Sequence, residues 1–294
     1  MSDRPQDLPR VTVVGCGLMG SALAKKLAEH GYPVSAWNRS PERAQALAPH
    51  GIAPVLSIAD AVHKADVVIA CTADLQITHA VFASVDDWHG VTVIELSTGG
   101  AEHVKALEAM ITGRGGKYLD GAIQCYPYEV GDVDAHFGYS GSPEVWADYE
   151  GMLMLFGGAS MYISDRVTDA SALLLGFSAF YVSALNAFVD AITYLHNRGL
   201  PGNALRNGSD GAIALLRRNV PHLIDAIESG NHETTEATIA TYLGAAHLIN
   251  DALHSAGQYS RQVDAAVADL NRAVDAGLGE LGFYALTRLT SEPN

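Results

Sequence analysis

The chain has 294 residues, of which 48% are hydrophobic and 17% charged, and a formal net charge of -15. This length and composition predict a folded protein of about two domains and exclude a disordered chain. The negative charge argues against nucleic-acid and anionic-membrane partners. The polar start, MSDRPQDLPR, does not resemble a signal peptide, and the three cysteines are scattered. We therefore expect a cytoplasmic protein without a disulfide framework.

The first predicted strand, Val11–Val14, runs into a glycine-rich turn. Gly15, Gly17 and Gly20 form the pattern GxGxxG, and an amphipathic helix follows as far as Gly31. In a dinucleotide site such glycines allow a tight turn, close approach of the pyrophosphate, and close packing of helix on strand. The helix N-terminus adds N–H groups and a partial positive charge. The pattern predicts a nicotinamide-dinucleotide site.

The second predicted strand, PVSAW, selects between the two nicotinamide cofactors. An NAD enzyme places Asp or Glu at the end of this strand, where it binds the ribose 2′-hydroxyl. Here the strand is followed by Asn38, Arg39, Ser40 and, three residues further on, Arg43. Arginine and hydroxyl side chains suit a 2′-phosphate, so we expect NADPH.

Further short apolar runs alternate with helical stretches up to about residue 165: IAPV, ADVVIACT, VTVIELS, GGKYLDGAI and SMYIS. This alternation predicts an α/β domain with a doubly wound parallel sheet, a Rossmann domain over residues 1–165. Ligands of such sheets bind beyond the C-terminal strand ends. The residues expected there, around the nicotinamide and its ribose, are Cys71, Thr72, Ala73, Ser97, Thr98, Ile123 and Gln124.

The sequence after residue 165 predicts an all-helical domain over residues 166–294. It begins with a long apolar helix from about Thr168 to Asn197, and breaks are expected around Gly199–Pro201, Pro221, Gly230 and Gly257. The helix is long enough to span a bilayer, but Asn186 and Asp190 are costly there. We interpret it as a helix buried between domains or subunits, which predicts an obligate homodimer.

A series of motifs in this order resembles those of the NADPH-dependent imine reductases, relatives of the β-hydroxyacid dehydrogenases. They are GCGLMGSALA with WNRSPERA, LSTGG, YLDGAIQCYP, YSGSPEVW, LLLGF and AGLGELGFYAL. The resemblance implies a Rossmann domain, a long interdomain helix and a helical C-terminal domain that dimerises by exchange. It places the active site between the cofactor domain of one subunit and the helices of the other. The implied cofactor contacts are Gly15, Gly17, Leu18, Met19, Gly20, Asn38, Arg39, Ser40 and Arg43; Thr98 stands where many members have Asn.

The resemblance also implies a substrate pocket at the start of the long helix. Aligning LLLGF puts Ser171 where imine reductases usually carry Asp or Tyr. A serine hydroxyl is a poor acid, so we expect Ser171 to orient the substrate and the substrate to arrive as a preformed iminium. Asp169, Tyr181 and His247 are alternative proton donors. The expected pocket residues are Gln124, Tyr126, Leu175, Ser178 and Tyr242.

Two other functions compete with imine reduction. A β-hydroxyacid dehydrogenase needs a lysine on the long helix as its acid or base. The last lysine of this chain is Lys117, and DGAIQ also departs from the carboxylate-binding loop of those enzymes. A non-catalytic NADPH-binding protein is the second alternative. His247, Asp251 and His254 have metal-ligand spacing, but in a chain with 12 histidines we expect no metal site.

Overall fold

The computed structural model describes residues 8–290, so most of the polar stretch used to argue against a signal peptide lies outside the described residues. The chain divides between Ser178 and Ala179 into two compact units, called here the first and the second unit.

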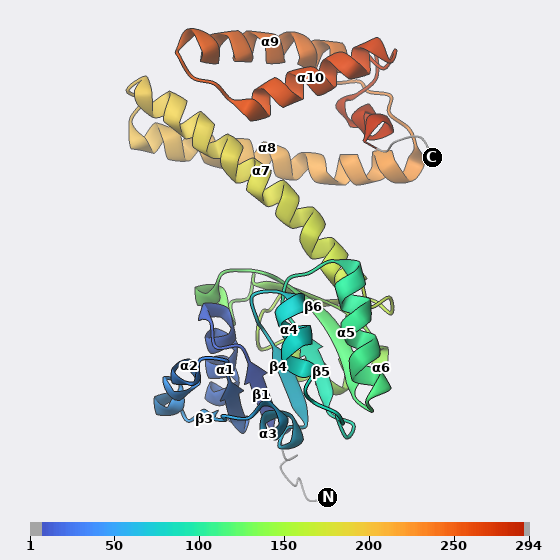
Figure 1. Cartoon of the computed structure of the whole chain (residues 1–294). Coiled ribbons are helices and arrows are strands. Elements are labelled where there is room, and N and C mark those ends of the chain that lie inside the picture. The colour runs from blue at the N-terminus through green and yellow to red at the C-terminus, as the bar shows by residue number, and fades with distance from the viewer. Residues whose placement is uncertain (1–7, 291–294) are drawn as a thin grey trace, which may run out of the picture. The chain divides into compact units, whose positions relative to one another are not determined.

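The first unit is built on one sheet of eight strands in the order β3-β2-β1-β4-β5-β6-β7-β8 (Figure 1). All neighbouring strands are parallel except β6 and β7, which are antiparallel. The predicted α/β Rossmann architecture is confirmed. The strands are β1 Val11–Val14, β2 Val34–Trp37, β3 Ala53–Pro54, β4 Val67–Ala70, β5 Thr92–Glu95, β6 Lys117–Gln124, β7 His136–Gly141 and β8 Met161–Ser164.

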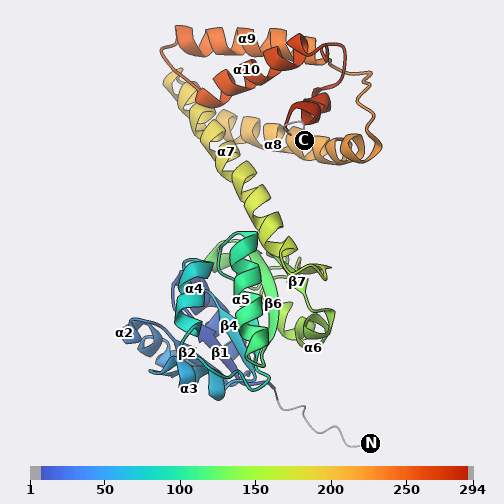
Figure 2. The same cartoon turned by 45° about the vertical axis from the view of Figure 1, so that its right-hand side comes forward.

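Helices cover both faces of this sheet, so each central strand is buried on both sides. Val13 and Ile69 face a core that includes Leu23 of α1, whereas Val14 and Val68 face a core that includes residues of α4 and α5. Figures 1 and 2 show α4 and α5 side by side. The helices are α1 Leu18–Glu29, α2 Pro41–Gln45, α3 Ile58–His63, α4 Leu75–Phe82, α5 Ala101–Gly113 and α6 Pro143–Leu153, with short 3-10 turns at Ala48–His50 and Pro127–Glu129.

Strand β7, with the sequence HFGYSG, was not predicted. Two glycines and a serine interrupt its apolar residues, which removes the usual strand signal. Gly138 packs closely against β8, since a Cβ there would lie 2.8 Å from the end of the Ile163 side chain. Tertiary packing therefore decides this strand, and it pairs residue by residue with β6.

The second unit is helical, as the sequence predicts. Figures 1 and 2 show α9 and α10 packed side by side. The buried core of this unit consists of Ile239, Leu270 and Ala273 from these two helices and Ala285 from the 3-10 segment that follows. The helices are α7 Asp169–Asn197, whose first residues belong to the first unit, α8 Gly202–Ser229, α9 Ile239–Ser255 and α10 Arg261–Asp275, followed by the 3-10 segment η3 Phe283–Leu289.

The break expected at Pro221 is wrong, because α8 continues through this residue. Proline has no N–H, so the carbonyl of Arg217 loses its helical donor. Two residues before Pro221, the Asn219 side chain donates a hydrogen bond to the Leu215 carbonyl at 2.9 Å. The amphipathic pattern of α8 outweighs one missing hydrogen bond.

Helix α7 matches the predicted long apolar helix, but the single chain leaves it largely uncovered. Its most apolar 18-residue window is only 6% buried, and Phe177, Val182 and Val189 are each more than half exposed. By length and composition it is also the one helix within residues 8–290 that is able to cross a membrane, which is weak evidence by itself. This apolar surface calls for a covering partner.

Candidate functional site

The turn after β1 has the geometry of a phosphate-binding loop. Gly15 has a φ of +104°, and a Cβ on Gly20 would lie 1.9 Å from the Gly15 carbonyl oxygen. A Cβ on Gly17 would meet nothing within 4 Å. Gly17 is the residue before α1 and has no side chain that could cap the helix, so the first amides of α1 stay available to a ligand. Backbone packing fixes two glycines, and the third leaves open space for an anion.

Asn38 ties this loop to the end of β2. Its Oδ1 accepts from the Cys16 amide at 2.9 Å, and its Nδ2 donates to the Ser40 carbonyl at 3.0 Å. Leu18 is 84% exposed at the start of α1, while Met19 packs partly against the core. The cofactor residues predicted from the first two strand ends therefore lie together.

Arg39 and Arg43 are exposed, and neither forms an ion pair with any part of the chain that the structure describes. The charge of Arg43 is felt at the glycine loop: it opposes the effect of burial, which raises the pKa of the Cys16 thiol to about 11. Ser40 precedes α2 without capping it by its side chain. Two guanidinium groups and one hydroxyl are thus available for a phosphate.

The ends of β4 and β5 are joined by a buried hydroxyl cluster. The Thr72 amide donates to Ser97 Oγ at 2.8 Å, and the Thr72 hydroxyl lies 2.8 Å from that of Thr78. The Leu75 amide donates to the Thr98 carbonyl at 3.0 Å. Cys71 is half-buried, and burial raises the pKa of its thiol to about 12, so it is a neutral thiol. Ala73 and Thr98 are exposed at this edge, as expected for residues that line a ligand.

Glu95, at the end of β5, is a buried carboxyl group that the sequence analysis did not single out. Its Oε1 accepts from the Ser97 amide at 2.7 Å, while its Oε2 has no hydrogen-bond partner among the described residues. Burial, together with the nearby charge of Asp120, raises the pKa of Glu95 to about 8. Glu95 therefore carries a proton near neutral pH.

Asp120 and Ser140 hold the start of α7. They lie opposite each other on β6 and β7, and Asp120 is also opposite Glu95 on β5. Asp120 Oδ2 accepts from the Ser171 amide at 3.1 Å and from its hydroxyl at 2.7 Å. Ser140 Oγ accepts from the Ala170 amide at 2.8 Å. Buried side chains of two strands, β6 and β7, thus bind the first turn of the helix.

This geometry adds a structural role to the one predicted for Ser171. The residue is only 1% exposed, and its hydroxyl donates a hydrogen bond to Asp120. Ser171 therefore holds the start of the helix, and its role in orienting a substrate stays a prediction. The partner, Asp120, is 51 residues away in the sequence, which is why the pattern around LLLGF did not reveal it.

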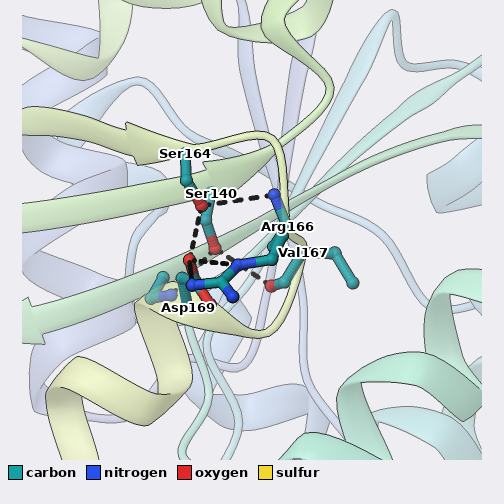
Figure 3. A network of polar contacts seen from close by, with 6 residues as sticks. Ser140, Ser164, Arg166, Val167 and Asp169 are labelled. Carbon is teal, nitrogen blue, oxygen red and sulfur yellow. Dashed lines mark hydrogen bonds and ion pairs between the residues drawn. The ribbon is translucent and has the colours of Figure 1, made fainter.

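Asp169, the alternative acid on the same turn, is also engaged. Figure 3 shows Ser164 and Arg166 directed at its carboxylate. Ser164 Oγ donates to Asp169 Oδ2 at 2.7 Å, and the Arg166 guanidinium lies 2.9 Å away. The bond from Ser164, with the charge of Arg166, lowers the pKa of Asp169. The structure therefore argues against Asp169 as a proton donor near neutral pH.

The remaining expected residues fall on both units. Ile123 is half-buried and Gln124 exposed at the end of β6, and the Tyr126 ring stacks on Tyr128 with centroids 5.6 Å apart. Leu175 and Ser178 follow on α7 in the first unit. Tyr181, Tyr242 and His247 belong to the second unit and are exposed. Within residues 8–290 no group of three or more His, Cys, Asp or Glu side chains is placed to hold a metal ion.

The buried carboxyl pair predicts an unusual pH dependence of stability. Burial raises the pKa of Asp120 to about 7 from an ordinary 3.8, and that of Glu95 to about 8 from 4.5. The folded state therefore binds these protons more tightly, so their stabilisation is complete below about pH 4 and is lost as the pH rises through 7 to 8. We expect the free energy of unfolding to fall by on the order of 2 kcal/mol between pH 5 and pH 8.

Urea unfolding at several pH values, followed by the fluorescence of the buried Trp88, measures this effect. Glu95→Gln is expected to remove about half of the slope, because Asp120 keeps its own raised pKa, whereas Glu102→Gln, at a largely exposed side chain, is expected to keep all of it. Equal slopes in the wild type and Glu95→Gln contradict the assignment of the proton to Glu95.

Known proteins match both parts of the chain. A family described as the NAD binding domain of 6-phosphogluconate dehydrogenase matches residues 10–164, and one described as an NADPH-dependent reductive aminase-like C-terminal domain matches residues 172–292. An NADPH-dependent reductive aminase of Aspergillus oryzae is 31% identical over 183 residues, 60% of this chain and 62% of that protein. The similarity thus spans less than two thirds of that relative.

Two further relatives bear on the class. A solved imine reductase from Pseudomonas sp. superposes with a TM-score of 0.92 and 27% identity, over 97% of this chain and 100% of the other. Glyoxylate/succinic semialdehyde reductase 1 of Arabidopsis thaliana is 25% identical over 203 residues, 66% of this chain and 69% of that protein. The Pseudomonas structure therefore shares its fold with nearly the whole of this chain.

The phosphate loop and these matches define a nicotinamide-dependent oxidoreductase with a Rossmann domain and a helical C-terminal domain. Within that class, the chain belongs to the family of NADPH-dependent imine reductases and reductive aminases. The predicted family, fold class, oxidoreductase class and cofactor are confirmed.

Proposed function

We propose that this protein reduces an imine or iminium ion to an amine with NADPH, and that its preferred substrate is a preformed iminium. The observation that carries the choice of substrate is the first turn of α7, where the Ser171 hydroxyl is bonded to Asp120 and Asp169 is paired with Arg166. Neither is free to protonate a substrate nitrogen. The described second unit contains no lysine, which opposes the oxidation of an alcohol.

The chemistry needs little from the protein beyond binding and orientation. NADPH, when bound, supplies a hydride to the iminium carbon; the electron pair of the C=N bond moves to nitrogen, and the products are a neutral amine and NADP⁺. A neutral imine must first gain a proton, which demands an acid. For a preformed iminium the residues at the strand ends only have to position the reactants and exclude water.

The test compares a permanently charged N-alkyl iminium with the matching neutral imine across pH. We expect turnover of the charged substrate to be nearly independent of pH between 6 and 9, and turnover of the imine to fall as its solution protonation falls. Rapid reduction of the neutral imine well above its own pKa would reveal an enzyme acid and overturn the proposal. Tyr181→Phe and His247→Asn then identify which alternative donor acts, with NADPH affinity as the control.

The cofactor preference follows from the loop after β2. We propose that Arg39, Ser40 and Arg43 meet the 2′-phosphate, with the glycine loop, Leu18, Met19 and Asn38 around the rest of the dinucleotide. NADPH is then expected to bind at least about tenfold more tightly than NADH, a difference of ~1.4 kcal/mol. Titration by nicotinamide fluorescence measures both affinities, and Arg39→Ala should remove most of the difference without weakening NADH. An unchanged preference in Arg39→Ala contradicts this assignment.

The remaining proposals concern assembly and location. We propose a homodimer in which the apolar side chains of α7 are covered by a second copy, a domain boundary near residue 165, and a cytoplasmic protein. The exposed Phe177, Val182 and Val189 support the dimer. The proposed contacts with substrate are those of Gln124, Tyr126, Leu175, Ser178 and Tyr242, and those with the nicotinamide are at Cys71–Ala73, Ser97, Thr98 and Ile123.

A further inference from the structure

The second unit contains a pocket of about 390 Å³, most of whose lining residues have no part in the proposed reaction. It lies between the end of α8, the segment 230–237 and the residues Gly282–Tyr284. This volume is within the range of pockets that hold small molecules. Tyr242, at the start of α9, is its one residue that also belongs to the proposed substrate pocket.

The walls of this pocket are held by specific contacts. The Gly282 amide donates to the His232 carbonyl at 2.8 Å, and Gly282 also bridges to Thr238. A Cβ on Gly282 would lie 3.0 Å from the Thr234 side chain, so the two segments pack closely here. The Tyr284 hydroxyl donates to Asn219. The pocket is therefore built by packed elements and not by a single loose loop.

The charge of the pocket is one-sided. Its lining includes the carboxylates of Asp225, Glu233 and Glu236 and contains no lysine or arginine. None of the three is in an ion pair within residues 8–290. Three uncompensated carboxylates around one cavity attract a cation.

A buried histidine is the second feature that indicates a ligand. His232 lines the pocket, is only 8% exposed, and its Nδ1 has no hydrogen-bond partner among the described residues. Burial, together with the charge of Arg288, lowers the pKa of His232. Arg288 is not itself a lining residue. A neutral imidazole has an acceptor nitrogen, which suits a ligand that donates N–H bonds.

Aromatic rings complete the wall. Tyr242 and Phe283 stand edge to face with centroids 4.9 Å apart, and Tyr284 lies beside them. Aromatic faces attract cations and also cover alkyl groups. The pocket thus combines acids, a neutral acceptor and apolar surface.

We propose that this pocket binds a small protonated amine that carries an alkyl or cyclic substituent. This goes beyond the proposed reduction, which assigns no ligand to the carboxylates or to His232 of this pocket. Amines of this kind are produced by the proposed reaction and are protonated near neutral pH, and amine reactants of reductive amination have the same chemistry. Either source presents N–H donors and a positive charge to the same residues.

Binding to the full-length protein without NADPH tests this site, by calorimetry with three probes. Piperidinium represents a cyclic amine product, methylammonium an amine reactant, and tetrahydropyran is a neutral molecule of the size of piperidine. We expect both cations to bind and tetrahydropyran not to bind, and the tighter cation identifies the source. The affinity for the cations is expected to fall at high salt, because Asp225, Glu233 and Glu236 are all exposed to solvent.

The double variant Asp225→Asn/Glu233→Gln is expected to weaken binding of the cations at least tenfold. Glu228→Gln, which removes a carboxylate of the same helix outside the pocket lining, serves as the matched control and should bind like the wild type. Equal binding of tetrahydropyran, or unchanged affinity in the double variant, overturns the proposal. Iminium reduction is assayed in parallel, so failure of this site and failure of the proposed function give separate results.

Discussion

Gly17→Ala leaves the protein without cofactor as stable as the wild type but weakens NADPH binding by about a hundredfold, or ~2.7 kcal/mol. The added Cβ meets no atom of the protein within 4 Å, so the fold has no reason to change. It projects instead into the space over the start of α1, where we expect the pyrophosphate to approach the backbone. Thermal unfolding without cofactor and fluorescence titration with NADPH measure the two effects separately.

Gly20→Ala is the matched variant with the opposite expectation. Its Cβ would lie 1.9 Å from the Gly15 carbonyl oxygen, so β1 and α1 have to move apart. We expect the free energy of unfolding to fall by about 3 kcal/mol even without cofactor. If Gly17→Ala is destabilised as much as Gly20→Ala, or binds NADPH normally, the phosphate site is not at this loop.

The wild type is expected to be a dimer at micromolar concentration, and Val182→Glu/Val189→Glu a monomer that has lost at least about a hundredfold in turnover. The two valines are seven residues apart on α7, and so lie on the same side of the helix, and are 64% and 57% exposed in the single chain. A charge on each makes their burial against a second copy prohibitive. Loss of the dimer removes the helices that the partner would add to the active site.

Light scattering measures the oligomeric state, and steady-state kinetics the turnover. Leu56→Glu serves as a control, because Leu56 is 72% exposed but lies in the first unit and outside the sequence of α7. A wild type that stays monomeric at micromolar concentration contradicts the dimer. A monomeric double variant with full activity contradicts the composite site.

The sequence predicts best what depends on local chemistry. The glycine spacing and the arginines after the second strand are each recognisable within a few residues of sequence. In the structure, Asn38 links the glycine loop to the end of the second strand. The long helix was also predictable, because an apolar helical run extends from about Thr168 to the break at Gly199–Pro201. Strand β7 was missed because its partner β6 and the Ile163 side chain, more than its own residues, stabilise it.

The catalytic assignment depended on contacts that no local pattern reveals. Ser171 looked like a pocket residue because only its position along the helix was visible. Its carboxylate partner comes from β6. The contacts of Asp169 with Ser164 and Arg166 likewise depend on the conformation of the chain between the end of β8 and the start of α7. Glu95 escaped notice since one acid in an apolar strand gives no signal of its burial opposite Asp120.

The anchoring of α7 by side chains from distant strands has a consequence for how the helix opens. The amides of Ala170 and Ser171 donate to Ser140 and Asp120, so they become free only when the sheet itself comes apart. Hydrogen exchange at these amides should follow global unfolding of the first unit, although first-turn amides of a helix ordinarily exchange by fraying. Amides beyond Ser178 should instead exchange with the second unit. A single continuous helix would then report the stabilities of two separate cooperative units, and binding of NADPH would slow exchange at one end of α7 and not at the other.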